Sequence, residues 1–270
     1  MLMPKPDLTA LTGGYRRIPV LQIGADVYCD TASIARRLEA ISPEPACISP
    51  ASAGLAGMIE DWADHRLAFQ VVPPVLVEML PELPPAVLAD RAAMSPTFTP
   101  GTWAAAAPRA WRQALSSLDH LERQLAERPF LLGDGFSIAD AACFHPVWFS
   151  KRSAKLFRAV GARSALEAWF ARIEGFGTGD VRPLSNADAV SVARRSDPTD
   201  VEGGVPTMNG FALGDSVAVT ADDYGSESSR GTIVRLTADE ITILRRDAAS
   251  GDIAVHFPWS GYRIDKDAGR

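Results

Sequence analysis

Apolar and polar positions near the N-terminus of this chain predict two short strands joined by a tight turn. The runs Pro19–Ile23 and Val27–Cys29 are rich in β-branched and apolar residues, as strands are. Gly24-Ala25 between them predicts a type II′ hairpin, because glycine accepts the positive φ of the first turn position. After the hairpin the spacing changes to that of a helix beginning at Asp30-Thr31, with an apolar stripe at Ile34, Leu38 and Ile41.

The middle of the chain has apolar residues three and four positions apart, which predicts a series of helices. The first is expected from Ala51 to about Val72, where Pro73-Pro74 should break or kink it. The clearest stripe lies in Trp103–Arg128, with the regular helix starting near Pro108, because proline is tolerated in a first turn. Residues 1–18, with their prolines and paired glycines, are expected to form a loop.

The last segment returns to alternation of apolar and polar residues with intervening turns, which predicts short antiparallel strands. These strands are expected at Ser216–Thr220, Thr232–Leu236, Ile241–Arg245 and Ile253–Phe257. We expect them to close into a small SH3-like barrel. The cluster Phe257-Pro258-Trp259 with Tyr262 has two interpretations, a recognition face or, as we favour, barrel core.

Composition narrows the classes of function. The chain is 47% hydrophobic and 22% charged, as in a soluble globular protein, and its net charge of −6 disfavours nucleic-acid partners. No apolar run reaches membrane-spanning length and the N-terminus lacks a signal-peptide core, so no membrane association is expected. The three cysteines, Cys29, Cys47 and Cys143, lack CxxC spacing, which argues against disulfides and a metal site and favours the cytoplasm.

The most specific motif is LLGDGFSIAD, in which Ser137 and Asp140 have the spacing of a capping box. Each side chain of such a box accepts a hydrogen bond from the backbone N–H of the other residue. The helix that follows is apolar, and His145 within it is expected to be a hydrogen-bonded core residue, because no ligand-type residue stands at metal spacing beside it. This segment resembles the capping-box signature of the glutathione S-transferase helical domain.

The N-terminal hairpin and helix resemble the second half of the thioredoxin-like domain of the same family. The resemblance implies that the backbone of Ile18, before the cis-proline position Pro19, pairs with the cysteinyl part of glutathione. It also implies that Asp30 and Thr31 hold the γ-glutamyl end at a helix N-terminus, where N–H groups favour a carboxylate. A plainer interpretation makes Asp30 an N-cap and Pro19 an edge-strand proline.

The implied fold class is a multi-domain α+β protein. Residues 1–48 would be a partial thioredoxin-like β-β-α segment that binds glutathione. Residues 49–198 would be the all-α helical domain, residues 199–210 a linker, and residues 211–270 the small β module. In the helical domain, the family's electrophile pocket makes substrate-pocket candidates of four residues: Trp62, His65, Arg66 and Phe69. The alternative, which we favour, is that Trp62 and Phe69 are core while His65 and Arg66 are a solvated face.

The stretch before the hairpin departs from the family pattern. A strand-helix-strand unit needs at least about 30 residues, and 18 residues precede Pro19. That unit carries the Tyr, Ser or Cys that activates the glutathione thiol, so we expect no catalytic residue within this chain. Either the start codon is assigned too far downstream, which we favour, or the chain is a truncated, glutathione-incompetent relative.

Two functional hypotheses follow. The first is a cytoplasmic, dimeric glutathione S-transferase-like enzyme, with glutathione as co-substrate, a small electrophile as substrate and no metal. It would conjugate glutathione if the missing unit is supplied, and otherwise bind glutathione with weak or no activity. The second is a non-catalytic scaffold or dimerisation protein whose β module recruits a partner.

Overall fold

The computed structural model describes residues 2–225 and 227–267, which form two compact units. The first, here called the sheet unit, combines residues up to Leu38, the short stretch Ala93–Ser95, and the chain from Arg182 onward. The second, the helical unit, contains Glu39–Ala92 and Pro96–Val181. In sequence, the helical unit therefore interrupts the sheet unit.

The sheet unit is made of both ends of the chain. Its N-terminal part contains α1 (Pro6–Thr12), β1 (Val20–Ile23), β2 (Asp26–Cys29) and most of α2 (Thr31–Ile41). Its C-terminal part contains one helix and seven strands: α10 (Asn186–Arg194), β3 (Thr207–Met208), β4 (Phe211–Ala212), β5 (Ser216–Ala221), β6 (Ser229–Leu236), β7 (Glu240–Asp247), β8 (Gly251–Pro258) and β9 (Tyr262–Lys266).

Seven of these strands form one sheet, in the order β1-β2-β8-β7-β6-β5-β9. The hairpin forms as expected, with Val20 paired to Cys29 and Gly24 at a φ of 60°. The new feature is that β2 runs parallel to β8, with Val27 opposite Val255 and Tyr28 opposite His256. The N-terminal hairpin is thereby an extension of the C-terminal strands.

The strand positions expected from alternation agree with the structure, but their grouping differs. The expected boundaries separate residues 1–48 from residues 211–270, whereas the structure joins strands of both segments in one sheet. Alternation reveals which residues face the core and says nothing about which distant strand pairs with which. Closure into an SH3-like barrel stays a prediction, since the described strand pairs run as an open series from β1 to β9.

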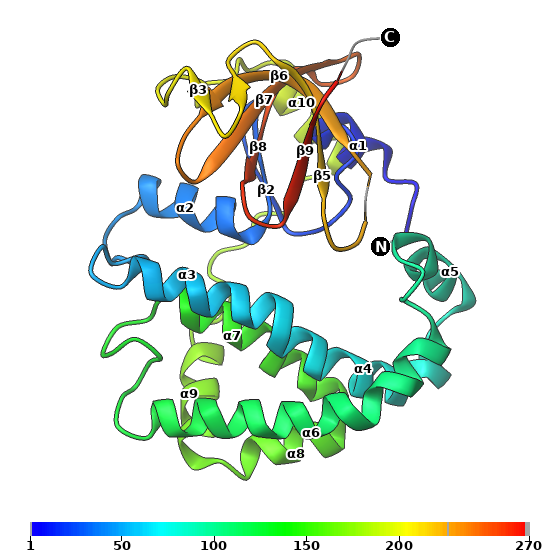
Figure 1. The fold of residues 1–270 in the computed structure, drawn as a ribbon, viewed down its shortest axis with the longest axis vertical. Helices are drawn as coiled ribbons and strands as arrows, with labels where there is room; N and C mark the ends of the chain where they lie inside the picture. The colour runs from blue at the N-terminus through cyan, green and yellow to red at the C-terminus, as the bar shows by residue number, and fades with distance from the viewer. Residues whose placement is uncertain (1, 226, 268–270) are drawn as a thin grey trace. The chain divides into compact units, whose positions relative to one another are not determined.

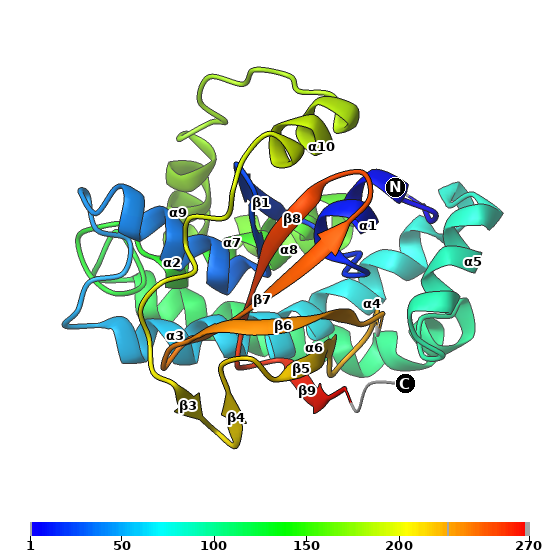
Figure 2. The same ribbon diagram turned by 90° about the horizontal axis from the view of Figure 1, so that it is seen from above.

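The core of the sheet unit draws on both ends of the chain. Val27 and Cys29 of β2 are fully buried beside Ile243, Val255 and the other inward residues of the C-terminal strands. Figure 2 shows α1 and α10 beside these strands, and the side-chain amide of Gln22 in β1 donates to the carbonyl of Ala189 in α10. One shared core thus fixes the hairpin against the C-terminal strands.

The helical unit contains seven α-helices among its described residues (Figure 1). They are α3 (Ala53–Trp62), α4 (Ala68–Met79), α5 (Pro85–Met94), α6 (Pro100–Leu125), α7 (Ile138–Phe149), α8 (Ala154–Gly161) and α9 (Ser164–Glu174). A π-helical turn, Ala63–Leu67, joins α3 to α4, and two 3-10 turns, Leu80–Glu82 and Ser150–Arg152, follow α4 and α7. Figure 1 shows α6 as the long helix of this unit, which packs on α4 and α9.

Prolines interrupt these helices less than their positions predict. Helix α4 continues through Pro73 and Pro74, and α6 starts at Pro100 and continues through Pro108. Thr99 caps α6 by accepting a hydrogen bond from the backbone N–H of Thr102. Packing of a long apolar face offsets the hydrogen bond that an internal proline removes. Residues 1–18 also differ from the expected loop, because Pro6–Thr12 forms α1.

The capping box expected at Ser137 and Asp140 is present at the start of α7. Asp140 is fully buried and accepts from the backbone N–H of Ser137 at 3.0 Å. It also accepts from the backbone N–H of Leu131 and from the indole of Trp169, each at 2.8 Å. His145 of the same helix is exposed, contrary to the expected core position, because it lies on the outer face of α7.

Among the described residues, the helices are all too short or too polar to cross a membrane.

Candidate functional site

The sequence-predicted glutathione residues lie together at the open end of the hairpin. Because Val20 pairs with Cys29, the residues just outside this pair, Pro19 and Asp30, are neighbours across the hairpin. The Ile18–Pro19 peptide bond is cis, and both residues are exposed. Thr31, also exposed, begins α2. The structure therefore brings Ile18, Pro19, Asp30 and Thr31 to one surface of the sheet unit.

Asp30 is held in an unusual backbone conformation at the start of α2. Its φ is 80°, in the left-handed region that residues other than glycine seldom occupy. One carboxylate oxygen, Oδ1, accepts the backbone N–H of Ala32 at 3.0 Å. Strained backbone of this kind persists where surrounding contacts fix it, and it concentrates at binding sites.

The other oxygen of the Asp30 carboxylate is bound by the C-terminal strands. Tyr262 of β9 donates its hydroxyl to Asp30 Oδ2 at 3.1 Å, and its ring centre lies 6.3 Å from that of Tyr15. Burial first, and then the Asp30 charge, raise the pKa of Tyr262. Tyr262 therefore stays protonated and remains a hydrogen-bond donor to the carboxylate.

The loop between β5 and β6 holds the backbone on the other side of the candidate site. Arg16, which is buried, pairs with Glu227 at 3.0 Å. The guanidinium of Arg17 forms an ion pair with Asp223 and lies 3.9 Å from the centre of the Tyr224 ring. These contacts fix the residues immediately before Ile18. The β5–β6 loop therefore supports the Ile18 side of the site, and Tyr262 of β9 supports the Asp30 side.

Cys29 is the cysteine beside this site, but it is not placed to act as a nucleophile. Its side chain is fully buried in the core. Burial, and then the Asp30 charge, raise the pKa of the Cys29 thiol, whereas the thiolate is the reactive form. Tyr15 is likewise buried, and burial raises the pKa of its hydroxyl. Both side chains belong to the structure beneath the site.

The four substrate-pocket candidates lie on one helical stretch of the helical unit. Trp62 ends α3 and is partly buried against the core, while His65 and Arg66 are exposed on the π-helical turn. Phe69, in the first turn of α4, is 44% exposed, so the expectation that it lies in the core is wrong. His65 Nδ1 lies 3.2 Å from the Asp61 carboxylate.

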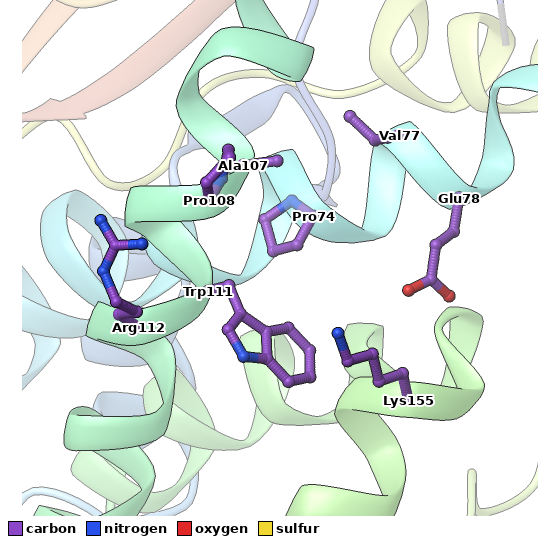
Figure 3. Close-up of a pocket in the computed structure, with 8 residues that line it drawn as sticks. All are labelled: Pro74, Val77, Glu78, Ala107, Pro108, Trp111, Arg112 and Lys155. Atoms are coloured by element: carbon purple, nitrogen blue, oxygen red, sulfur yellow. The ribbon is translucent and has the colours of Figure 1, made fainter.

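A pocket of about 360 Å³ lies elsewhere on the helical unit (Figure 3). Its lining comes from α4, α6 and α8, and none of the four candidates belongs to it. Figure 3 shows Trp111 beside Pro74 and Pro108, and the ammonium of Lys155 lies 4.4 Å from the centre of the Trp111 ring. The lining combines an apolar surface with the charged groups of Glu78, Arg112 and Lys155.

A buried polar cluster joins β2, β7 and β8. His256 has no exposed side-chain surface, with its Nε2 3.1 Å from Asp26 Oδ1 and its Nδ1 3.1 Å from Glu240 Oε1. Both carboxylates are acceptors and therefore favour an imidazole protonated on both nitrogens, and Thr242 Oγ1 also lies 3.1 Å from Nδ1. Burial alone would lower the pKa of His256, but its bonds to Asp26 and Glu240 outweigh burial and raise that pKa.

This cluster also has the donor types of a metal site, since ligand atoms of Asp200, Glu240 and His256 lie within 4.8 Å of one another. Those atoms already have partners. Arg235 Nη1 lies 2.9 Å from Glu240 and 3.6 Å from Asp200, and the Tyr28 hydroxyl donates to Asp200 at 2.9 Å. Arg235 and His256 lie against these carboxylates, and we assign the cluster a structural role.

Sequence reasoning missed the contribution of the C-terminal strands to the candidate site. The sequence marks Tyr262 only as part of an aromatic cluster, and no sequence pattern marks Tyr15 or Arg17 as part of a site. Their roles depend on contacts with residues more than two hundred positions away, such as the 232 that separate Tyr262 from Asp30. No spacing rule within a single sequence identifies such pairs.

Comparison with known proteins supports the family suggested by the motifs. The model of the glutathione S-transferase C-terminal domain matches residues 104–172. A GST-like protein from Pseudomonas syringae is 34% identical, with a TM-score of 0.82, over 98% of this chain and 87% of that protein. A glutathione S-transferase from Rhodospirillum rubrum is 16% identical, with a TM-score of 0.46, over 69% of this chain and 83% of that one.

No curated protein matches the chain. The likeness to the Pseudomonas syringae protein extends through the hairpin, the helical unit and the C-terminal strands, because it covers nearly all of this chain. At that identity and coverage, and with the domain match within the helical unit, the chain belongs to the glutathione S-transferase family.

Proposed function

We propose that this protein binds glutathione at the open end of the β1–β2 hairpin, as a transferase-like member of its family. One observation carries the proposal: the Asp30 carboxylate stands at the N-terminus of α2, beside exposed Ile18 and Pro19. A carboxylate at this place can pair with the ammonium of the γ-glutamyl group. The helix N-terminus and Thr31 can receive the γ-glutamyl carboxylate, and the Ile18 backbone can pair with the cysteinyl part.

The proposed chemistry is conjugation of the glutathione thiolate to a small electrophile. The thiolate is the nucleophile, so a hydrogen-bond donor to sulfur is needed. Cys29 and Tyr15 are unsuited to this part, because both are buried. Ile18, Asp30 and Thr31 would bind the peptide, and the group that activates the sulfur is not assigned. Trp62, His65, Arg66 and Phe69 are the proposed electrophile contacts.

The proposal also covers the oligomeric state and the cellular compartment of the protein. We propose a homodimer in the cytoplasm. The exposed apolar residues Leu55 and Met58 on α3 support an interface with a second copy, and the three free cysteines agree with a reducing compartment. The alternative is a scaffold without catalytic activity. This alternative is supported by the pairing of the N-terminal hairpin with the C-terminal strands, because that pairing has a structural role whether or not the protein is an enzyme.

The test is glutathione binding by an Asp30 variant. Asp30→Asn keeps an acceptor for Tyr262 and the cap of α2 but removes the negative charge. A charge-assisted hydrogen bond is worth about 1.5–3 kcal/mol, so the dissociation constant for glutathione should rise roughly tenfold to a hundredfold. Isothermal titration calorimetry of the purified chain measures it.

Asp188→Asn is the matched control, since Asp188 is also an acidic residue at a helix start in the sheet unit. It should leave glutathione binding unchanged. Equal affinities of the wild type and Asp30→Asn would exclude Asp30 as the ammonium contact. An absence of glutathione binding by the wild type would favour the scaffold.

A further inference from the structure

The Asp30 carboxylate is fixed by a residue from the opposite end of the chain. Tyr262 Oη donates to Asp30 Oδ2 at 3.1 Å, and the Ala32 N–H donates to Oδ1 at 3.0 Å. An ionised carboxylate has about four acceptor positions. These two bonds therefore fix the orientation of the group and leave further lone pairs for a ligand.

Tyr262 is itself held rigidly. It is buried, and Ala221 of β5 lies opposite it in the sheet. Its ring packs on Phe257 and Tyr15, with ring centres 5.3 Å and 6.3 Å away. This packing holds the Tyr262 ring in place, and with it the hydroxyl that donates to Asp30.

The backbone of Asp30 makes this external support necessary. At a φ of 80°, Asp30 occupies a region that costs of order 1–3 kcal/mol for a residue other than glycine. Asp tolerates this region better than most residues, yet its carboxylate still has rotational freedom about its side-chain bonds. A buried hydroxyl on a strand removes that freedom before any ligand arrives.

We infer that Tyr262 is a positioning residue of the glutathione site: it orients the Asp30 carboxylate for the ammonium of the γ-glutamyl group. This inference rests on the proposed function. It gives the C-terminal strands a part in ligand recognition, and the ion pairs of Arg16 and Arg17 tie the residues before Ile18 to the β5–β6 loop. Positioning improves affinity by lowering the cost of ordering the site on binding.

A purely structural role for the Tyr262 hydroxyl predicts a different result. Loss of a structural bond lowers stability and weakens all ligands of the site alike. Loss of positioning weakens a ligand that carries the ammonium and spares one that lacks it. The two probes are glutathione and glutaryl-cysteinyl-glycine, which is glutathione without its amino group.

The variant is Tyr262→Phe, which keeps the ring and its packing and removes only the hydroxyl. We expect the dissociation constant for glutathione to rise about threefold to tenfold and that for glutaryl-cysteinyl-glycine to stay unchanged. Tyr28→Phe is the matched control, because Tyr28 lies in β2 of the same sheet and its hydroxyl donates to a different carboxylate, Asp200. It should change neither constant. Thermal unfolding of each variant checks that it folds.

The outcomes separate the inference from the proposed function. If Asp30→Asn weakens glutathione binding and Tyr262→Phe does not, the inference is wrong and the proposed function stands. Equal weakening of both ligands by Tyr262→Phe also overturns it, in favour of a structural hydroxyl. If the wild type does not bind glutathione, both fall together. If Asp30→Asn binds glutathione as the wild type does, Asp30 is not the ammonium contact and the inference is wrong.

Discussion

Some buried polar residues in this protein have hydrogen-bond partners in several elements. Asp140 shows how far a sequence can anticipate this. Its spacing from Ser137 predicts the capping box, because both residues lie within one helical turn. Its bonds to Leu131 and Trp169, nine and 29 residues away, follow from tertiary packing and have no local signal. The capping bond of Asp140 can therefore be predicted from the sequence, and its bonds to Leu131 and Trp169 cannot.

The ionisation of His256 is coupled to the stability of the sheet unit, because its imidazole is buried between two carboxylates. Its raised pKa means that its contribution to stability is fully present below the ordinary histidine value of about 6.5. That contribution is lost as pH rises through the raised pKa of the folded state. For its partner Asp26, burial alone would raise the pKa, but bonds from His256 and Thr199 outweigh burial and lower it. The Asp26 contribution is therefore present above about pH 4 and lost as pH falls through the lowered value.

We expect the sheet unit to lose stability as pH rises from about 6.5, and His256→Gln to weaken that dependence. Gln can keep one hydrogen bond but carries no charge, and loss of one partner from a buried ion pair costs about 3 kcal/mol. Hydrogen exchange of β2 and β8 at several pH values, corrected for intrinsic rates, measures the effect. His120→Gln, a change in the helical unit, is the control. An unchanged pH dependence in His256→Gln would show that another group controls it.

Among the elements, the β1–β2 hairpin could be predicted from the sequence, whereas its pairing with β8 could not. The turn at Gly24, both strands and the start of α2 were predictable, because each depends on a few neighbouring residues. The parallel pairing of β2 with β8 was not, since it joins residues from opposite ends of the chain. The helices that run through Pro73, Pro74 and Pro108 differ from prediction for a related reason: burial against other helices stabilises them.

Pairing of β2 with β8 makes the hairpin dependent on the C-terminal strands. Val27 is fully buried opposite Val255, so Val27→Ala should destabilise the sheet unit by about 2 kcal/mol. We expect faster hydrogen exchange in β7 as well as in β1 and β2, because these strands share one core. Val147→Ala in α7, equally buried, is the control and should act on the helical unit. Faster exchange confined to β1 and β2 would contradict a shared core.

At the scale of the whole molecule, the proposed second copy must cover exposed apolar surface. On α3, Leu55 is 49% exposed and Met58, one helical turn later, is 65% exposed. Neither Gly54 nor Gly57 has a neighbour at its Cβ position, so this side of the helix is open among the described residues. Contiguous apolar residues of this kind are typical of protein interfaces.

If α3 forms the dimer interface, Met58→Glu should shift the purified chain from dimer to monomer, because it buries a charge without a partner. Sedimentation velocity at several protein concentrations measures the distribution. Leu184→Glu changes a residue of similar exposure (63%) outside α3 and should leave the dimer intact. A dimer that persists in Met58→Glu would place the interface elsewhere, and a monomeric wild type would exclude it.

The division of the sheet between the two ends of the chain affects how the protein is made. Asp26 and His256 are 230 residues apart, so a ribosome completes β8 well after β2 has emerged. At about 5–20 residues per second, that interval is roughly ten to fifty seconds. During synthesis the nascent hairpin therefore has an unpaired strand edge, which chaperones or neighbouring nascent chains can contact. Because β2 pairs with β8, the N-terminal half of the candidate site reaches its folded state only after β8 has been made.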